Sequence, residues 1–471
     1  MANPDAIVIG SGPNGLAAAI ALARAGRRVV VYEAAPTIGG GARSAELTRP
    51  GFVHDVCSAI HPFAVASPFF RTLPLAEHGL EWIDPPAMLA HPFDDGSAAV
   101  VVRSADRTAA ALGTDGAAYR AVVGSVADNW PRLESTVLAP FRFPRYPFTA
   151  ARFGLDALRS AETIARRFSG RDARALFAGI AAHGMLPLDR APTAGFGLVL
   201  GALAHVVGWV LPRGGAQKIP DALAAHLRSL GGEIITSSPV VSIDELPPAR
   251  AILCDLSPKP LLRIAGHRFP SAYRDLLEQY RYGMGAFKVD WALDAPIPWR
   301  TEACARAATV HLGGTMEEIA ASERDAWEGR ISERPFVLLV QPTLFDPSRA
   351  PSGKHTAWAY CHVPHASTVD MVDRIESQIE RFAPGFRDRI LARSVMTPAD
   401  IEHRNANLVG GDIGAGVTDL YQFFSRPTWR WYSTPVRGLY LCSAATPPGV
   451  GVHGMCGYFA AERALKDVLR G

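Results

Sequence analysis

Three glycines near the start of the chain have the spacing of a phosphate-binding turn. Gly10, Gly12 and Gly15 follow the apolar run 6–9 and precede an Ala/Leu-rich stretch at 16–25. The first glycine permits a tight turn out of a strand, the second lets the main chain approach a pyrophosphate, and the third lets the helix pack against the sheet. The helix N-terminus would offer free N–H groups to the phosphates. We therefore predict a dinucleotide site that includes Gly10, Gly12, Pro13, Asn14 and Gly15.

Glu33 completes this unit. It ends a second apolar run, 29–32, which comes after Gly26, a residue suited to closing the preceding helix. A carboxylate at the end of the second strand accepts hydrogen bonds from ribose hydroxyls, and its charge disfavours the 2′-phosphate of NADP. Because strand, glycine turn, helix, strand and acid occur in order, we prefer a dinucleotide site to a glycine-rich turn without a ligand. Glu33 and the adjacent Ala34 are thus predicted to bind the cofactor.

A second glycine cluster narrows the choice of cofactor. Gly39, Gly40 and Gly41 are followed, after one alanine, by Arg43 and Ser44. A glutamate, a short spacer, paired glycines and Arg-Ser resemble the extended FAD fingerprint of the flavin amine oxidase and phytoene desaturase superfamily. The resemblance implies that the cluster follows the pyrophosphate and ribityl chain, with the arginine beside the flavin. It implies that Gly40, Gly41, Arg43 and Ser44 bind FAD, and the alternative is a flexible loop.

The end of the chain contains another turn of this kind. A strand expected at 438–442 leads into the Gly- and Pro-rich segment 443–454, and a helix follows. A helix N-terminus after a glycine-rich turn favours negative charge. In the superfamily that the chain resembles, this helix end faces the flavin pyrimidine. The resemblance therefore implies cofactor contacts at Ser443, Ala444, Gly451, Val452 and His453.

The same segment distinguishes two branches of that superfamily. Flavin amine oxidases usually carry an acidic residue where this chain has Ala444. The Gly-Ala-x-Thr-His-Pro-Gly pattern of phytoene desaturases is nearer, although Ser443 replaces its first glycine and Pro447 its histidine. His453 stands where the branch related to phytoene desaturase and retinol saturase approaches the flavin edge. The resemblance is therefore stronger to the phytoene desaturase branch.

Three side chains are candidates for moving protons, and His453 is the first. Lys288 lies in the apolar run 284–293, which is similar to the strand that opens the substrate sheet of flavin amine oxidases, where a lysine holds a water against flavin N5. An unpaired lysine is costly to bury, which favours a ligand or aqueous contact, although a strand residue can also point to solvent. His61 is the third candidate, and a purely structural role fits it equally well.

Composition excludes several classes of protein. The 471 residues are 48% hydrophobic and 20% charged with a net charge of +3, which is ordinary for a soluble protein and demands no nucleic acid. Six cysteines without a Cys-x-x-Cys pair predict reduced thiols and no metal cluster. No basic segment precedes the first apolar run, so we expect no signal peptide and a cytoplasmic protein. The apolar stretch 194–211 contains His205 and several glycines, which predicts a buried helix that lines a pocket.

The region 132–174 mixes nine arginines and four acidic residues with aromatic residues. Such a mixture can stack on nucleic acid, or it can rest on a lipid surface and admit a lipophilic substrate. It can also form a helical lobe with a solvated arginine face and an aromatic core side. Nothing else in the chain supports nucleic acid. We prefer the helical lobe and keep peripheral membrane contact as the second interpretation.

The elements that position these residues predict an α/β fold. We expect a Rossmann-like FAD-binding domain, of the type with two dinucleotide-binding domains, assembled from the discontinuous segments 1–72, 212–270 and 435–471. An α+β substrate-binding domain would use 73–211 and 271–434, with a helical lobe at about 105–210. By the resemblance, the main chain of Val240 meets the adenine ring.

The resemblance implies an FAD-dependent oxidoreductase similar to phytoene desaturase. Such an enzyme moves hydride between a C–C bond of a lipophilic or conjugated substrate and flavin N5, as a desaturase, saturase or isomerase. Only one dinucleotide fingerprint is present, so NAD would lack a second site. Two alternatives stay open: a flavin amine oxidase producing hydrogen peroxide, and a non-catalytic FAD-bound interaction protein. Oxygen or a quinone is a candidate electron acceptor, and the sequence leaves both the acceptor and the oligomeric state undetermined.

Overall fold

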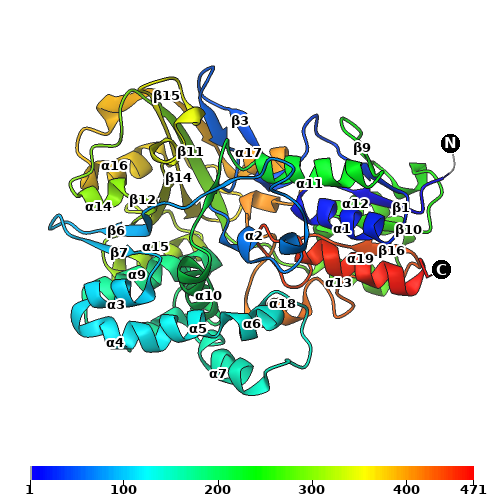
Figure 1. Ribbon diagram of the computed structural model, residues 1–471, viewed down its shortest axis with the longest axis horizontal. Helices are drawn as coiled ribbons and strands as arrows, with labels where there is room; N and C mark the ends of the chain where they lie inside the picture. Colours follow the sequence, from blue (N-terminus) through cyan, green and yellow to red (C-terminus); the bar gives the residue numbers. More distant parts are fainter. Residues whose placement is uncertain (1–2, 471) are drawn as a thin grey trace.

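Figure 1 shows the computed structural model of the chain, which describes residues 3–470. A parallel sheet lies at the right of this view, beside both chain termini, and a larger mixed sheet lies at the left. A group of helices between α3 and α10 lies below the mixed sheet. The α/β class expected from the sequence is therefore confirmed.

The parallel sheet has five strands in the order β16-β10-β1-β2-β9. All four pairings are parallel, and β1 is buried along its whole length because neighbouring strands flank it and helices cover both faces. Three separate stretches of sequence supply the strands. Their bounds are β1 Ala6–Ile9, β2 Val29–Tyr32, β9 Glu233–Ile235, β10 Ala251–Cys254 and β16 Leu439–Leu441.

Helices pack on both faces of the parallel sheet. On one face α1 (Pro13–Arg24), α11 (Lys218–Ser229) and α19 (Met455–Asp467) share a core with the strands. On the other face α12 (Pro258–Ala265) and α13 (Ser271–Glu278) pack against β1, β10 and β16. Parallel strands covered on both faces are the arrangement that nearly continuous apolar runs predict.

The mixed sheet has seven strands in the order β15-β11-β14-β13-β12-β6-β7. Its pairs are antiparallel except β12–β6, which is parallel. On one side it packs against α16 (Val372–Phe382), and on the other against α15 (Met316–Trp327) and the helical lobe. The bounds are β6 Ala87–Pro92, β7 Ala98–Val101, β11 Gly285–Leu293, β12 Ala307–Leu312, β13 Val337–Val340, β14 His355–Val363 and β15 Ile390–Met396.

The helical lobe surrounds α10, which runs from Thr193 to Val206 and packs against α9. This helix is the apolar stretch for which the sequence predicts a buried helix beside a pocket. The other bounds in the lobe are α3 Ala105–Ala111, α4 Gly116–Tyr119, a π-helical turn Arg120–Gly124, α5 Ser125–Asp128, α6 Trp130–Val137, α7 Pro147–Ala157, α8 Ala161–Ala165 and α9 Arg171–Ala181. Short connecting elements are β3 Ser44–Glu46, β4 Val53–Asp55, α2 Pro62–Ala66, β5 Trp82–Ile83, β8 Leu211–Pro212, α14 Glu302–Ala305, α17 Pro398–Arg404 and α18 Leu420–Ser425.

The lobe differs from the sequence expectation in where its aromatic residues lie. Trp130 and Phe168 are buried, as an aromatic core side requires, but Phe141, Phe143 and Phe148 are exposed. The cause is local: prolines at 140, 144 and 147 interrupt the chain between α6 and α7, because proline lacks an amide hydrogen and disfavours helix in the preceding residue.

The cysteines all carry free thiols in the structure, and five of the six are buried. Residues 3–470 contain no cluster of three or more His, Cys, Asp or Glu side chains arranged to hold a metal ion. Over the same residues, no helix combines the length and the apolar character needed to span a bilayer.

Candidate functional site

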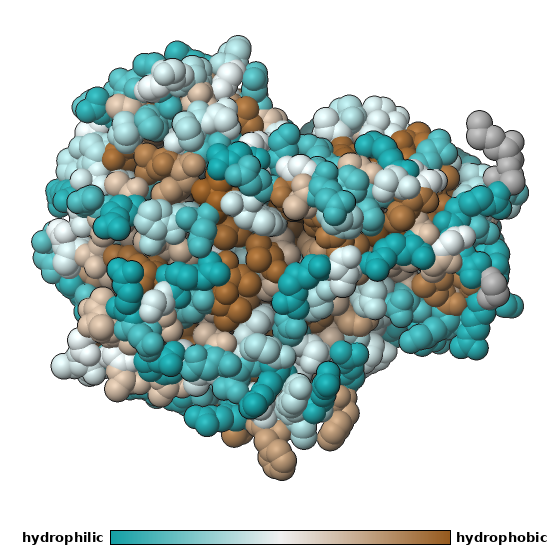
Figure 2. Space-filling model, in the orientation of Figure 1, coloured by the Kyte–Doolittle hydropathy of each residue, from teal (hydrophilic) through white to brown (hydrophobic). Residues whose placement is uncertain are grey.

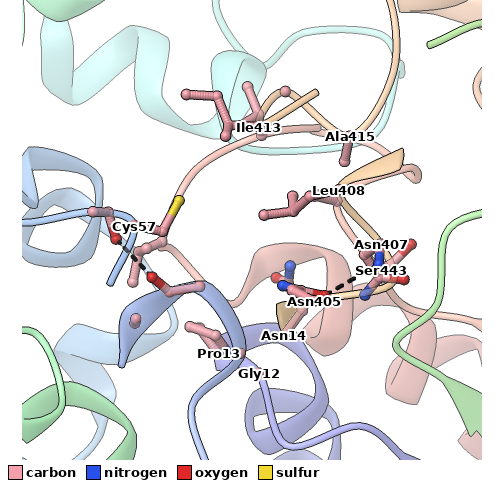
Figure 3. Close-up of a pocket in the computed structure, with 18 of the residues that line it drawn as sticks. Gly12, Pro13, Asn14, Cys57, Asn405, Asn407, Leu408, Ile413, Ala415 and Ser443 are labelled. Atoms are coloured by element: carbon pink, nitrogen blue, oxygen red, sulfur yellow. Dashed lines mark hydrogen bonds between the residues drawn. The ribbon is translucent and has the colours of Figure 1, made fainter. Parts of the chain in front are cut away.

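The principal cavity of the molecule begins at the carboxyl ends of β1, β10 and β16 and has a volume of about 820 Å³. Its first part is lined by the turn that follows β1, and its second part reaches the helical lobe and the mixed sheet. The carboxyl edge of a parallel sheet is where this class of fold binds its ligands, and the volume is typical of a small-molecule site. Figure 3 shows how Gly12, Pro13, Asn14 and Ser443 face the residues of a later loop across the cavity.

The turn after β1 is built so that only glycine fits. Gly10 has a φ of +99°, and a Cβ on Gly15 would come within 2.0 Å of the carbonyl oxygen of Gly10. A Cβ on Gly12 would lie 2.7 Å from Oδ2 of Asp255. Pro13 has no amide hydrogen and the N–H of Gly15 donates to Asp255 at 3.0 Å, so of the first three positions of α1 only Asn14 offers its N–H to an anion. Pro13 and Asn14 also line the cavity, which brings all five residues predicted for this turn together.

Glu33 lies beside that turn and lines the cavity together with Ala34. Its Oε2 accepts hydrogen bonds from the main-chain N–H of Ser11 at 2.9 Å and from the Ser11 hydroxyl at 2.5 Å. Its Oε1 accepts from the N–H of Ala35 at 2.9 Å. Three donors hold the carboxylate in place, and a carboxylate has about four acceptor positions, so it can still accept a ribose hydroxyl.

The second glycine cluster packs directly on the first. Gly39 and Gly40 have φ values of +116° and +56°, and a Cβ on Gly40 would lie 3.2 Å from Cα of Gly12. Gly40, Gly41 and Arg43 all line the cavity. The Arg43 side chain donates to the carbonyl oxygens of Gly40 at 2.8 Å and of Arg404 at 2.6 Å, and burial lowers its pKa.

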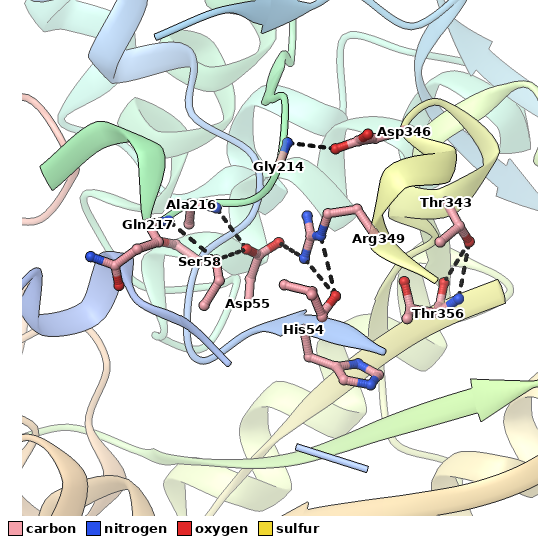
Figure 4. Close-up of polar contacts among 12 residues, drawn as sticks. His54, Asp55, Ser58, Gly214, Ala216, Gln217, Thr343, Asp346, Arg349 and Thr356 are labelled. Atoms are coloured by element: carbon pink, nitrogen blue, oxygen red, sulfur yellow. Dashed lines mark hydrogen bonds and ion pairs between the residues drawn. The ribbon is translucent and has the colours of Figure 1, made fainter. Parts of the chain in front are cut away.

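Ser44 differs from its neighbours because it lies outside the cavity lining. Its hydroxyl donates to Oδ1 of Asp55 at 2.7 Å and accepts from the N–H of Gln217 at 3.1 Å. Figure 4 shows Asp55 between the N–H of Ala216 and the guanidinium of Arg349. Ser44 therefore belongs to a polar network that joins β3 and β4 to the start of α11.

The two remaining segments predicted for the cofactor lie at opposite ends of the first part of the cavity. Val240 lines it from the loop after β9, beside Arg263 and Ile264 of α12. Ser443 and Ala444, at the end of β16, line it farther along with Gly451 and Val452.

His453 is placed differently from its neighbours in sequence. It is buried outside the cavity lining, and its Nδ1 accepts a hydrogen bond from the N–H of Met455 at 3.0 Å. The ring also lies edge-on to Phe63, with centroids 6.1 Å apart, and burial lowers its pKa to about 4. In this arrangement His453 caps the first turn of α19 as a neutral side chain.

Lys288 is buried in β11 and forms an ion pair with Asp290 on the same face of the strand. Its Nζ lies 4.9 Å from the centre of the Trp358 ring. Burial raises the pKa of Asp290 to about 6, although the positive charge of Lys288 opposes this shift. Lys288 lines a second, smaller cavity of about 30 Å³ with Gly40, Gly41, Arg43, Cys57 and Tyr360. That volume matches the share of one water molecule.

His61 is the predicted proton-handling residue that lines the principal cavity. Its side chain is buried, and within residues 3–470 neither ring nitrogen has a hydrogen-bond partner. Burial lowers its pKa to about 4, so the ring is neutral near pH 7. A neutral imidazole with a free nitrogen can accept a proton from a ligand.

Several lining residues escaped prediction from the sequence. Asp255 follows β10, and its Oδ2 accepts from the N–H of Gly15 at 3.0 Å. Its position directly after a strand of a parallel sheet was a usable signal. The segment 403–418 supplies Asn405 and Asn407 to the cavity lining (Figure 3). Asn407 is fixed because its amide accepts from the N–H of Ser257 and donates to the carbonyl of Asp255.

The second part of the cavity is mainly apolar and aromatic. The side chains that line it come from α10, the mixed sheet and the connections between them: Phe196, Leu200, Trp209, Leu338, Val340 and Trp358. His183 also lines this part, and burial lowers its pKa to about 3. Asp412 lines it too, but its carboxylate accepts the N–H groups of Gly283, Gly414 and Gly416.

Comparison with known proteins gives three kinds of match. Residues 8–73 match the family model described as an NAD(P)-binding Rossmann-like domain. A mouse protein named pyridine nucleotide-disulfide oxidoreductase domain-containing protein 2 is 28% identical and aligns over 98% of this chain and 94% of its own. A neurosporene-forming phytoene desaturase of Rhodobacter capsulatus is 26% identical over 52% of this chain and 51% of its own.

Solved structures share the fold over nearly the whole chain. An oxidoreductase from Methanosarcina mazei superposes with a TM-score of 0.65 at 18% identity, covering 97% of this chain and 99% of its own. Putrescine oxidase bound to putrescine superposes with a TM-score of 0.63 at 18% identity, covering 99% of each chain. At such identities the likeness concerns the fold, which is a Rossmann-like domain joined to a mixed-sheet domain.

Proposed function

We propose that this chain is an oxidoreductase of the FAD-dependent amine oxidase superfamily and of its phytoene desaturase-like branch. In this proposal it moves hydride between a C–C bond of a lipophilic substrate and FAD. The observation that carries the proposal is the continuity of the cavity. One space leads from the glycine turn, suited to a pyrophosphate, to a chamber lined by apolar and aromatic side chains. A dinucleotide and a lipophilic molecule could therefore meet in it.

The residues present fit FAD. Three closely packed glycines shape the turn, and the buried Asn14 Oδ1 has no hydrogen-bond partner among residues 3–470. The N–H of Asn14 and the positive end of the α1 dipole would hold the pyrophosphate, Glu33 a ribose, and Val240 the adenine. The path of Gly40, Gly41 and Arg43 would hold the ribityl chain and flavin. FAD, when bound, supplies the acceptor and donor for hydride.

The apolar chamber supports a substrate without charge. Phe196, Leu200, Trp209 and Trp358 offer surfaces for an extended or conjugated carbon chain. Such side chains exclude water and fix orientation by shape. The Asp412 carboxylate accepts three main-chain N–H groups and lies near the positive charge of Arg426, which offsets its attraction for an ammonium group.

His61 is our candidate for handling the proton. Loss of hydride from one carbon leaves a neighbouring C–H acidic, and a neutral imidazole in the cavity can accept that proton at a ring nitrogen. The same atom, once protonated, would return a proton in the direction of saturation. His453 caps α19 and Lys288 pairs with Asp290, so neither is as free to exchange a proton with a molecule in the cavity. In the direction of desaturation, oxygen or a quinone would take the electrons removed from the substrate.

Amine oxidation is the second candidate function. It is favoured by Lys288 and by the cavity of about 30 Å³ beside it, which is large enough for one water molecule. In the fold family that the chain resembles, a lysine in this place holds a water beside the flavin. An amine oxidase would release hydrogen peroxide with amines and would lose activity in Lys288→Met.

The test begins with the visible spectrum of the purified protein and chromatography of the released cofactor. We expect a flavin spectrum and FAD, followed by anaerobic bleaching of the flavin with conjugated polyenes. His61→Gln should slow bleaching about 100-fold at unchanged FAD content, because general acid–base catalysis contributes this much. His267→Gln, on the surface, is the matched control.

Three results would overturn the proposal. A protein that neither contains FAD nor binds it on reconstitution would not be a flavin enzyme. If amines bleach the flavin and form hydrogen peroxide while polyenes do not bleach it, the function is amine oxidation instead. A flavoprotein that no polyene or amine reduces would point to a non-catalytic FAD-bound interaction protein.

A further inference from the structure

Exposed aromatic side chains gather at one edge of the helical lobe. Phe141, Phe143 and Phe148 are 72%, 87% and 90% exposed, and Tyr421 and Phe423 of α18 are 70% and 36% exposed. We call these five residues the aromatic edge. In Figure 1 α7 lies at the bottom of the molecule and α18 lies above it near α6, and Figure 2 shows light-brown side chains projecting from the bottom.

The aromatic edge is one surface although its residues come from two distant segments. The ring of Phe141 meets that of Phe424 edge-on, with centroids 5.6 Å apart, and Phe424 meets Phe423 in the same way at 5.3 Å. Single exposed apolar side chains are ordinary, but a contiguous group of large ones marks a surface that contacts another body.

Arginine side chains occur in the same segment as the exposed phenylalanines. The segment 135–155 contains Arg142, Arg145 and Arg152 and no acidic residue. All three are exposed, and none takes part in the ion pairs found within residues 3–470. Three arginines farther along the lobe are paired with carboxylates instead: Arg167, Arg171 and Arg174. Unpaired arginines beside projecting rings complement a surface that is anionic outside and apolar inside.

We propose that the aromatic edge docks on an anionic lipid bilayer. The three phenylalanines would enter the boundary between headgroups and acyl chains, and the arginines would lie at the headgroup phosphates. A bilayer suits rings that project from a proline-rich connection, because it needs no pocket of matching shape.

The position of α18 gives this docking a consequence for the cavity. The segment 412–418, directly before α18, lines the cavity, and the hydroxyl of Thr418 donates to the carbonyl of Gly184 at 2.8 Å. A surface held against lipid would therefore lie next to the wall of the apolar chamber. The docking itself does not depend on the proposed reaction, because vesicles can be bound whether or not the flavin is reduced.

The experiment is sedimentation of the full-length protein, as purified, with vesicles. One set is phosphatidylcholine, and the other contains about one third phosphatidylglycerol, which supplies the anionic surface. We expect binding to the anionic vesicles that weakens as salt is raised. Phe141→Ser/Phe143→Ser/Phe148→Ser should lower the partition coefficient at least about 100-fold, because each buried ring is worth about tenfold. Arg142→Gln/Arg145→Gln/Arg152→Gln should remove the preference for anionic vesicles.

Matched controls remove similar side chains elsewhere. Leu276→Ser/Val395→Ser removes exposed apolar groups, and Arg228→Gln/Arg306→Gln/Lys466→Gln removes three exposed cations. Both should bind vesicles as the unaltered protein does. Failure of the unaltered protein to bind either set would overturn the proposal, as would equal binding by the phenylalanine variant. An oligomer that the phenylalanine variant dissociates, without lipid binding, would show instead that the edge is covered by a second copy.

Discussion

Nε2 of His183 lies 3.2 Å from Nε2 of His311 at the apolar end of the cavity. The His183 ring lines the cavity, whereas His311 is fully buried behind it in β12. Burial lowers the pKa of His183 to about 3 and that of His311 well below its usual range, so both rings are neutral at pH 7. One ring then donates and the other accepts, which fixes the tautomers of the pair.

His311→Leu should destabilise the protein by about 1–3 kcal/mol, because it leaves Nε2 of His183 without its partner. The pH dependence should change as well. Since the pKa of His311 is lower in the folded than in the unfolded state, its protonation opposes folding as the pH falls below about 6.5. Without the His311 side chain, the free energy of unfolding should fall less steeply as the pH is lowered. The slope should decrease by up to about 1.4 kcal/mol per pH unit.

Urea unfolding between about pH 7 and pH 4.5 measures both effects of His311→Leu, with the linear extrapolation giving the free energy. His267→Leu removes an exposed histidine and should shift stability by at most about 1 kcal/mol. An unchanged slope in the His311 variant would contradict the buried, neutral pair.

Gly15→Ala should abolish cofactor binding. The added Cβ would lie 2.0 Å from the carbonyl oxygen of Gly10, so the turn or the helix start must move. Overpacking of this kind costs about 1–3 kcal/mol of stability. Gly26→Ala is the control, because its Cβ meets nothing within 4 Å. Its only cost is the backbone strain of an alanine at a φ of +75°, about 1–2 kcal/mol. Flavin absorbance per protein should fall in the first variant and stay in the second.

Arg349→Met should lower the free energy of unfolding more than most single substitutions do. Nη2 of Arg349 lies 2.9 Å from Oδ2 of Asp55, and each side chain is 1% exposed (Figure 4). Removing the arginine leaves a buried carboxylate without its cation, which costs about 3–5 kcal/mol. The double variant Asp55→Asn/Arg349→Met removes both charges and should recover part of the loss. Thermal or urea unfolding of all three proteins would show this, and equal loss in the single and double variants would argue against the pair.

The sequence best predicts those structural features that depend on residues close together in the chain. The turn Gly10–Gly15 and the strands around it are local, so glycine spacing and apolar runs define them. The pairing of Lys288 with Asp290 was also within reach, because residues two apart in a strand share a face. Asp255 was missed because the residue that it contacts, Gly15, is 240 positions away in sequence.

Side-chain direction was the other limit of prediction from the sequence. His453 and Val452 are adjacent in the same loop, yet Val452 lines the cavity and His453 turns into the core to cap α19. Likewise, Phe168 and Phe148 look alike in sequence, and one is buried while the other is 90% exposed. Such differences depend on how the lobe packs against other elements, which periodicity alone does not specify.

We expect Asp255 to make the binding of FAD depend on pH. Burial raises its pKa to about 7, while the hydrogen bond from the N–H of Gly15 works in the opposite direction. Its carboxyl group lies at the N-terminus of α1, where a pyrophosphate would be held. We therefore expect the affinity for FAD to fall as the pH rises above about 7, by up to about tenfold per pH unit, because the ionised carboxylate repels the phosphates.

The same group should destabilise the cofactor-free protein at high pH. Its folded pKa lies above the unfolded value of 3.8, so the stability that it contributes is present at low pH and is lost as the pH rises through about 7. Asp255→Asn keeps an acceptor for the Gly15 N–H and cannot ionise. Quenching of FAD fluorescence at about pH 6 and about pH 8.5 should give different affinities for the unaltered protein and equal ones for the variant. Equal affinities in both proteins would mean that Asp255 does not sense the phosphates, whereas a fall that persists in the variant would locate the titrating group elsewhere.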